Sequence, residues 1–239
     1  MTETNQTETS KVKTSLVFTL TIIVGYVLFI IPDVFFGVTK INGGKSGINL
    51  MIIALFQFLS ITALLYASLK ILNKNFNFIG LQFVEIKKDI LLGAAFGTAW
   101  TIIQFVLIIP NTGGVNRDDI QGMLAMYDGS MMGTISFIIL GVIGGGITEE
   151  LFNRGYFINV LKDVFNNPKT GLWFSSILSV LIFTLGHMPS TALDWFDILV
   201  PTIIYTLLFV TTKRLTASIA AHSIYNMTAV ILTYNIYYN

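Results

Sequence analysis

Apolar stretches recur along this chain at a length that is sufficient to cross a lipid bilayer. A membrane-spanning helix needs about 20 mostly apolar residues, and seven stretches meet that requirement. The expected spans are residues 15–36, 48–72, 90–110, 134–161, 171–190, 197–213 and 216–237. No internal repeat or soluble domain separates them. The sequence therefore predicts an all-α, polytopic transmembrane helix bundle of about seven spans, with a four-helix core in the C-terminal half.

The composition agrees with an integral membrane protein and excludes several functions. Charged residues make up 11% of the chain and hydrophobic residues 54%, whereas a soluble domain carries roughly 25% charged residues. The net charge of +1 leaves no basic face for nucleic acid. The absence of cysteine excludes disulfides, thiolate metal sites and a cysteine nucleophile. The expected surroundings are the lipid bilayer and a membrane-associated partner; the oligomeric state stays open.

The segments outside the spans suggest how the chain is organised. Residues 1–14 are polar and are expected to form a disordered cytoplasmic tail. Residues 76–88 mix apolar and charged side chains and are expected to lie along the membrane interface as a connector. Residues 111–133 are rich in Gly and Met and form either a flexible lid or an ordinary extracellular loop. The predicted division is a tail at 1–14, N-terminal helices and loops at 15–133, and a catalytic helical core at 134–239.

The positive charges in the short loops predict the orientation. With seven spans, one side of the membrane has ten positive charges and the other has three. The first side carries Lys11, Lys13, Lys70, Lys74, Lys87, Lys88, Lys162, Lys169, Lys213 and Arg214, and the second carries Lys40, Lys45 and Arg117. Because cytoplasmic loops carry the excess of Lys and Arg, we expect a multi-pass protein of the cell membrane with a cytoplasmic N-terminus and an extracellular C-terminus.

Three short clusters contain the chemistry that the apolar spans offer. They are Glu149-Glu150-x-x-x-Arg154, Phe183-x-x-x-His187 and His222-x-x-x-Asn226, and they include both of the chain's two histidines. Ionisable side chains are costly inside a bilayer and are functional candidates by default. Each cluster alone also has a structural interpretation: an ion pair, an aromatic packing residue, or a hydrogen-bonded contact between helices. Their occurrence together on three apolar segments favours a functional site.

The first cluster places two carboxylates in different surroundings. Glu150 and Arg154 are four residues apart on a helix, so they share a face and can form an ion pair. Glu149 points to another face and has no helical partner, which suits it to accept a proton from water. The adjoining glycines 144–146 permit either the close approach of a neighbouring helix or the access of a substrate strand.

The other two clusters supply imidazole and amide groups. Phe183 and His187 share a helical face, so that the phenyl ring can shield the imidazole. Asn226 can orient His222 or stabilise a developing oxyanion. Glu149, His187 and His222 could bind a divalent metal such as zinc, or could act as an acid/base set without one.

The midpoints of the expected spans argue against a tight cluster. His187 lies about six residues beyond the midpoint of its span and His222 about five before the midpoint of its own. With a rise of about 1.5 Å per residue, the two histidines would be displaced in opposite directions by roughly 7–9 Å each. That separation is too wide for a metal site unless the helices tilt or the fifth span extends beyond Pro189.

At these three motifs the chain strongly resembles the CPBP family, the CAAX-protease and bacteriocin-processing (Abi) intramembrane proteases. The resemblance covers about residues 134–237 and implies hydrolysis of a peptide bond within the membrane. It assigns Glu149 to water activation with help from His187, and the oxyanion to His222 and Asn226. Glu150 and Arg154 become the supporting pair. The family has been described both as zinc-type and as glutamate-type; no His-Glu-x-x-His motif is present, so we favour a glutamate-activated water.

Three functions remain open on the sequence. The first is an intramembrane endopeptidase that acts either on prenylated C-termini or on leader and signalling peptides, with a role in peptide processing or self-immunity. The second is a non-catalytic immunity or scaffold protein that binds a sensor or peptide partner. The third is a small transporter or proton relay, although the chain lacks the repeat symmetry typical of transporters.

Overall fold

The computed structural model describes residues 3–238, and within them every regular element is helical. Seven helices are long and apolar enough to cross a membrane, which confirms the predicted polytopic bundle. They comprise Ser10–Thr39, Asn49–Ile71, Ile86–Asn111, Met131–Lys162, Pro168–Gly186, Ala192–Thr212 and Leu215–Tyr238. Short helical turns lie between them at Ile41–Gly43 (η1), Gly114–Asn116 (η3) and Asp118–Leu124 (α5).

Two of the seven spans are continuous helices in which α-helical and π-helical segments follow one another. The third consists of α3 (Ile86–Ile102), η2 (Ile103–Ile108) and α4 (Ile109–Asn111), and the fourth of α6 (Met131–Ile139), η4 (Leu140–Ile158) and α7 (Asn159–Lys162). The other spans are α1 (Glu3–Thr39), α2 (Asn49–Ile71), α8 (Pro168–Gly186), α9 (Ala192–Thr212) and α10 (Leu215–Thr233) with η5 (Tyr234–Tyr238). Segments η2, η4 and η5 have the wide turn of a π-helix, a form that is rare and frequent at functional sites.

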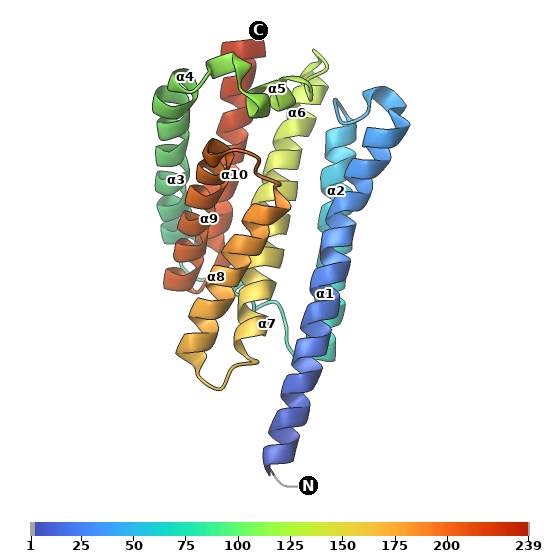
Figure 1. Ribbon diagram of the computed structural model, residues 1–239, viewed down its shortest axis with the longest axis vertical. Coiled ribbons are helices and arrows are strands. Elements are labelled where there is room, and N and C mark those ends of the chain that lie inside the picture. Colours follow the sequence, from blue (N-terminus) through green and yellow to red (C-terminus); the bar gives the residue numbers. More distant parts are fainter. Residues whose placement is uncertain (1–2, 239) are drawn as a thin grey trace.

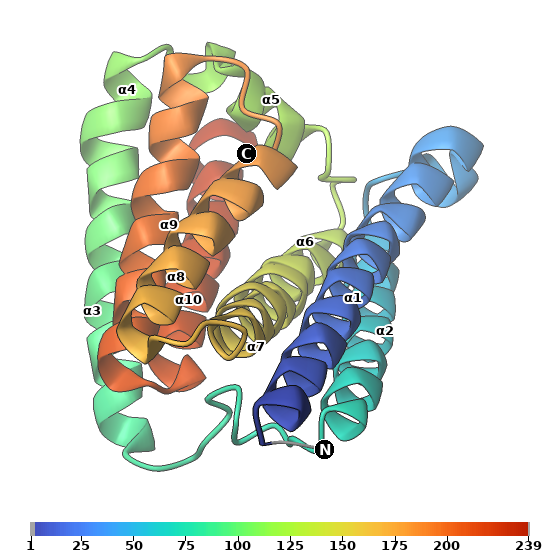
Figure 2. The same cartoon turned by 60° about the horizontal axis from the view of Figure 1, so that its bottom comes forward.

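The fourth span lies at the centre of the molecule. Figure 2 shows the helix from α6 to α7 between the α1–α2 pair on one side and α3, α8, α9 and α10 on the other. Its middle part, η4, contacts α1, α2, α8 and α10. Figure 1 shows the two ends of the chain at opposite ends of the bundle, as expected for an odd number of crossings. The first motif therefore lies on a helix that has neighbouring helices on both sides.

Local sequence signals explain where the helices of the other two motifs begin and end. The side chain of Asn167 caps the first turn of α8, and Pro168 occupies its first position. The expected span 171–190 ends early, at Gly186, because Pro189 disfavours a helical residue before it and Met188 has a positive φ of 52°. Thr191 and Asp194 then form a capping box that begins α9. His187 consequently lies just beyond the end of α8 rather than within a span.

The structure adds detail to the two segments expected outside the spans. The polar residues 3–14 are not a separate disordered tail, because α1 begins at Glu3. Residues 76–88 do connect α2 and α3, but they are not a surface segment throughout. Ile79 is fully buried, the backbone N–H of Leu215 donates to the carbonyl of Gly80 at 2.9 Å, and the last three residues begin α3. This connector thus supports the start of α10.

The glycines of the fourth span allow α10 to approach η4 closely, as one of the two sequence interpretations proposed. A Cβ atom at Gly146 would lie 2.0 Å from Oγ and 2.9 Å from Cα of Ser223 on α10. A Cβ atom at Gly145 would lie 2.5 Å from Nδ2 of Asn226. The absence of side chains at these two positions therefore sets the distance between the helices of the first and third motifs.

Gly146→Ala should destabilise the bundle by about 1–3 kcal/mol, because the added methyl group overpacks the contact with α10. Gly37→Ala is the matched control: no atom lies within 4 Å of the added Cβ, and the change raises helix propensity in α1. Thermal unfolding in detergent measures both. Equal midpoints for the two variants would contradict the close contact at Gly146.

Candidate active site

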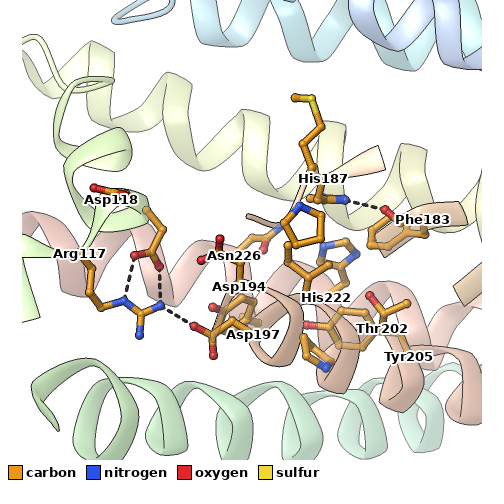
Figure 3. Close-up of a pocket in the computed structure, with 16 residues that line it drawn as sticks. Arg117, Asp118, Phe183, His187, Asp194, Asp197, Thr202, Tyr205, His222 and Asn226 are labelled. Atoms are coloured by element: carbon orange, nitrogen blue, oxygen red, sulfur yellow. Dashed lines mark hydrogen bonds and ion pairs between the residues drawn. The ribbon is translucent and has the colours of Figure 1, made fainter. Parts of the chain in front are cut away.

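The structure brings all three motifs together around the middle of η4. Glu149, Glu150 and Arg154 lie on η4. Phe183 lies in the last turn of α8 and His187 at its C-cap, while His222 and Asn226 lie on α10. Figure 3 shows Phe183, His187, His222 and Asn226 on the wall of one pocket.

Glu150 forms the buried centre of the site. Its Oε1 atom lies 3.0 Å from Nη1 of Arg154, and both side chains are fully buried. The guanidinium of Arg154 lies over the phenyl ring of Phe183, with Cζ 4.3 Å from the ring centroid. The ion pair expected from the i, i+4 spacing is therefore present. Phe183 packs in the interior, against the cation of this pair.

Glu150 also contacts the third motif, which the sequence did not indicate. Nδ1 of His222 lies 3.0 Å from Oε1 of Glu150. A carboxylate that is paired with an arginine accepts hydrogen bonds, so Nδ1 carries the proton in this contact. Nε2 of His222 faces the other way, 3.7 Å from the position of a Cβ at Gly145. Glu150 thus joins its ion pair with Arg154 to His222 in one contiguous unit.

His187 is held in a similar way by its own helix. Its Nδ1 atom lies 2.9 Å from the carbonyl oxygen of Phe183. Because a carbonyl only accepts hydrogen bonds, Nδ1 is the donor and Nε2 is left free. The phenyl ring of Phe183 lies 4.5 Å from the ring of His187 and 6.4 Å from the ring of His222. Phe183 therefore packs close to both imidazoles, and each imidazole keeps Nε2 without a hydrogen bond among residues 10–238.

Glu149 on η4 and Asn226 on α10 lie beside this unit and line one cavity together. Glu149 is partly buried, and its backbone carbonyl accepts a hydrogen bond from Nδ2 of Asn153 at 3.1 Å. The carboxylate takes part in no hydrogen bond or ion pair among residues 10–238. Asn226 donates from Nδ2 to the carbonyl of Gly141 at 2.9 Å. The carboxylate of Glu149 is thus available for a water molecule or a substrate.

Three adjoining cavities surround these side chains, and His187 lines all of them. The first, of about 470 Å³, is also lined by His222 and Asn226. The second, of about 420 Å³, is lined by Glu149 and Asn226. The third, of about 270 Å³, is lined by Glu149 and Tyr26 between α1 and η4. The four candidate catalytic side chains therefore face a connected set of cavities inside the bundle.

The depth estimate from the sequence was wrong, because it assumed that all spans are centred at one level. In Figure 1, α8 begins well below the turn that joins α9 to α10. His187 at the upper end of α8 and His222 in the lower half of α10 consequently reach the same cavity. The α7–α8 hairpin is shifted along the bundle relative to the α9–α10 hairpin. This shift compensates for the different positions of His187 and His222 within their own spans.

The three possible metal ligands, Glu149, His187 and His222, do not form a metal-binding cluster among residues 10–238. Within residues 10–238, no group of three or more His, Cys, Asp or Glu side chains is arranged to hold a metal ion. Nδ1 of His222 is bonded to Glu150, and Nδ1 of His187 is bonded to the carbonyl of Phe183. Glu149, His187 and His222 therefore do not fit the zinc site that the sequence left open.

The loop at residues 111–130, between the third and fourth spans, reaches the first cavity through Arg117. This buried guanidinium donates to Asp119 on the same loop at 2.9 and 2.8 Å and to Asp197 on α9. Burial opposes its charge, but the hydrogen bonds that it donates to Asp119 and Asp197 outweigh that effect and raise the pKa of Arg117 above its ordinary value. The loop is therefore fixed to α9 at the rim of the cavity, as Figure 3 shows.

Tyr205 is a member of the site that no motif marks. Its ring stacks on the imidazole of His222, with centroids 4.7 Å apart and an interplanar angle of 20°. It also lines the first cavity. A tyrosine in an apolar span carries no periodic or charge signal, so the sequence could not distinguish it from the packing residues around it.

Comparison with known proteins agrees with the motifs. Residues 131–228 match the family model described as type II CAAX prenyl endopeptidase Rce1-like. Among curated proteins, the chain is 38% identical over 104 residues to the UPF0177 protein YbdI of Lactococcus lactis subsp. lactis (strain IL1403). That alignment covers 43% of this chain and 51% of YbdI, so the chain spans about half the length of the curated relative it matches. No solved structure matches the chain.

The family match includes all three motifs together with the fourth to sixth spans and most of the seventh. It confirms the resemblance that those motifs indicated. Over residues 131–228, this chain is similar to the Rce1-like CAAX protease family, in agreement with the CPBP resemblance of its motifs.

Proposed function

We propose that this protein is an intramembrane endopeptidase whose catalytic core is formed by residues 134–239. The observation that carries the proposal is the convergence of Glu149, His187, His222 and Asn226 on adjoining cavities inside a bundle of seven membrane-length helices. The family match over residues 131–228 supports a protease of the membrane. Residues 15–133 supply the helices that enclose the core.

In this proposal the reaction begins with a water molecule beside Glu149. The carboxylate accepts a proton from water while the water oxygen attacks the carbonyl carbon of the substrate, and His187 orients the water through Nε2. A tetrahedral intermediate forms. When the C–N bond breaks, the proton held by Glu149 passes to the leaving amine, so that the carboxylate is regenerated.

The oxyanion of the intermediate is assigned to Asn226 and His222. The amide of Asn226 is a donor without any change of protonation. His222 can donate from Nε2 only as an imidazolium, because its other proton is committed to Glu150. Glu150 stabilises this charged form in the way that a buried carboxylate orients and stabilises a catalytic histidine. Donors fixed by the fold in a site that excludes bulk water can contribute several kcal/mol to catalysis.

The enclosed position of the site restricts the substrate. A helical substrate keeps its peptide groups hydrogen-bonded and unavailable, so cleavage favours unwound segments near a terminus. We propose a membrane-associated peptide of this kind, and we favour leader or signalling peptides, such as bacteriocin precursors, over prenylated C-termini. Processing of such a peptide would connect the enzyme to self-immunity.

Glu149→Gln should lower peptide cleavage by about 10²–10⁴-fold, because the variant lacks the group that accepts the proton from water. The assay uses proteoliposomes and fluorescence-quenched peptides of two kinds: a leader-type peptide, and a Cys-aliphatic-aliphatic-X peptide with and without a farnesyl group. Asp163→Asn is the control, since Asp163 lies at the end of α7, pairs with Lys74 and lines none of the three cavities.

The alternative function, a non-catalytic immunity or scaffold protein, makes the opposite prediction for the same variant. A scaffold would keep its cellular phenotype in Glu149→Gln. Cleavage at the wild-type rate by Glu149→Gln, or no cleavage of any of these peptides by the wild-type protein, would contradict the proposed protease.

Glu150→Gln should instead act on stability, which separates the supporting carboxylate from the catalytic one. Removing one partner of a buried ion pair leaves Arg154 uncompensated, which costs about 3–5 kcal/mol. Glu149→Gln removes no ion pair and should leave the thermal midpoint in detergent close to that of the wild type. Similar losses of stability in the two variants would contradict the division of roles.

We also propose that the N-terminus is cytoplasmic, on the strength of the positive charges in the loops. Because the chain has no cysteine, single-cysteine variants report the orientation directly. Asn116→Cys should react with an impermeant maleimide in intact cells, and Lys169→Cys only after the cells are permeabilised. Both positions are exposed in the structure. The reverse labelling pattern would place the N-terminus outside.

A further inference from the structure

Gln57 is a polar side chain in the apolar span α2, and one end of its amide is bonded by the protein. Nε2 donates to the backbone carbonyl of Phe29 on α1 at 3.0 Å. Because a carbonyl oxygen only accepts hydrogen bonds, this contact fixes which end of the amide is Nε2 and which is Oε1. Such a bond between helices is a common structural use of glutamine in a membrane bundle. It accounts for the nitrogen of the amide and leaves the oxygen without a role.

Oε1 of Gln57 is an acceptor that has no partner and is not sealed within the protein. The residue is 8% exposed, and Oε1 accepts no hydrogen bond from residues 10–238. It is not one of the polar atoms that are both without a partner and fully enclosed, so part of its surface is accessible. Gln57 lines the second and third cavities. The accessible acceptor therefore belongs to a side chain on the wall of the candidate site.

The direction of Oε1 follows from its distance to η4. A Cβ atom at Gly144 would lie 3.2 Å from Oε1, and Gly144 lines the second cavity together with Gln57 and Glu149. Both Gly144 and Glu149 lie in η4. Because bonded residues in a π-helix are five apart, these two positions lie one turn apart on the same face. Oε1 is thus about one helical turn away from the residue that we propose as the proton acceptor.

Gln57 also shares its two cavities with both residues that are proposed to act on water. Glu149 and His187 line the second and the third cavity, as Gln57 does. The free oxygen of the amide can only accept a hydrogen bond. A ligand that binds there has to bring an N–H or O–H donor close to the reacting atoms.

We propose that Oε1 of Gln57 binds the peptide substrate by accepting a hydrogen bond from one of its backbone N–H groups. An extended peptide presents N–H groups that have no intrahelical partner. One helical turn advances about 5 Å and an extended peptide about 3.3 Å per residue, so the bonded N–H lies about two residues from the scissile bond. The inference rests on the proposed protease activity and adds a substrate-binding residue from α2, outside the three motifs.

Backbone esters of the substrate test this contact, because an ester replaces one N–H by an oxygen atom. The assay uses whichever of the leader-type and Cys-aliphatic-aliphatic-X peptides the wild-type protein cleaves. One ester at a time is placed within about three residues of the scissile bond, on either side, and the scissile bond itself stays an amide. One of these esters should lower kcat/KM for the wild type by about tenfold, the effect of one hydrogen bond.

Gln57→Met keeps the length of the side chain and removes Oε1, so it should lower kcat/KM for the parent peptide by a similar factor. It also removes the bond from Nε2 to Phe29, and a lower kcat/KM alone therefore does not identify Oε1. The two changes are measured together for this reason. The sensitive ester should lower kcat/KM of Gln57→Met by less than about twofold, since the N–H that it removes no longer has a partner in the variant.

Gln82→Met is the matched control. Nε2 of Gln82 donates to the backbone carbonyl of Asn77 at 3.0 Å, and Gln82 lines none of the three cavities. The variant thus loses the same kind of bond through the same chemical change. It should keep the kcat/KM of the wild type and the tenfold effect of the sensitive ester.

Two results would overturn the role of Gln57 while leaving the protease intact. The first is a Gln57→Met variant in which the sensitive ester still lowers kcat/KM about tenfold. The second needs no variant of Gln57: the wild type tolerates every ester within about twofold while Glu149→Gln is inactive. Cleavage that survives Glu149→Gln would instead overturn the proposed protease, and the role of Gln57 with it.

Discussion

The buried charge of Arg154 organises the core of this bundle. An arginine inside a membrane bundle is tolerated only where an opposite charge and other contacts compensate for its lost hydration. Glu150 supplies the charge one turn earlier on η4, and Phe183 supplies the face of its ring from α8. Because Glu150 also bonds His222 on α10, the compensation of a single charge connects the three helices that carry the motifs.

This arrangement gives two adjacent glutamates different properties. Glu150 is fully buried and held between a guanidinium and an imidazole. Glu149, one residue earlier, faces the cavities on the other side of η4 and has no partner for its carboxylate among residues 10–238. Neighbouring carboxylates in different environments are a common way to separate an orienting group from a proton acceptor. In both histidines, Nδ1 is bonded by the protein and Nε2 remains free, which fixes the direction in which each can act.

Sequence patterns identified the site residues correctly where the free-energy cost depends only on neighbouring residues in the chain. The cost of placing charges in apolar spans is sufficient to identify Glu149, Glu150, Arg154, His187 and His222 from the sequence alone. The i, i+4 spacing correctly indicated the pair of Glu150 and Arg154. The midpoint argument for His187 and His222 failed because the stagger of helical hairpins depends on packing between helices. The contact of Glu150 with His222 and the stacking of Tyr205 on His222 have no local signature, since the partners are many residues apart.

The order of the amino acids is enough to establish that this chain is a polytopic helical membrane protein, which side chains are available for chemistry, and which family its motifs resemble. These features follow from the length and apolarity of each stretch and from the spacing within each motif. The packed bundle was needed to establish that the motifs meet around His187, that Glu150 holds His222, and that the ligands expected for a metal stay apart within residues 10–238. The physical reason is that helix tilt, stagger and the close approach at Gly145 and Gly146 are set by packing between helices, which no single stretch of sequence encodes.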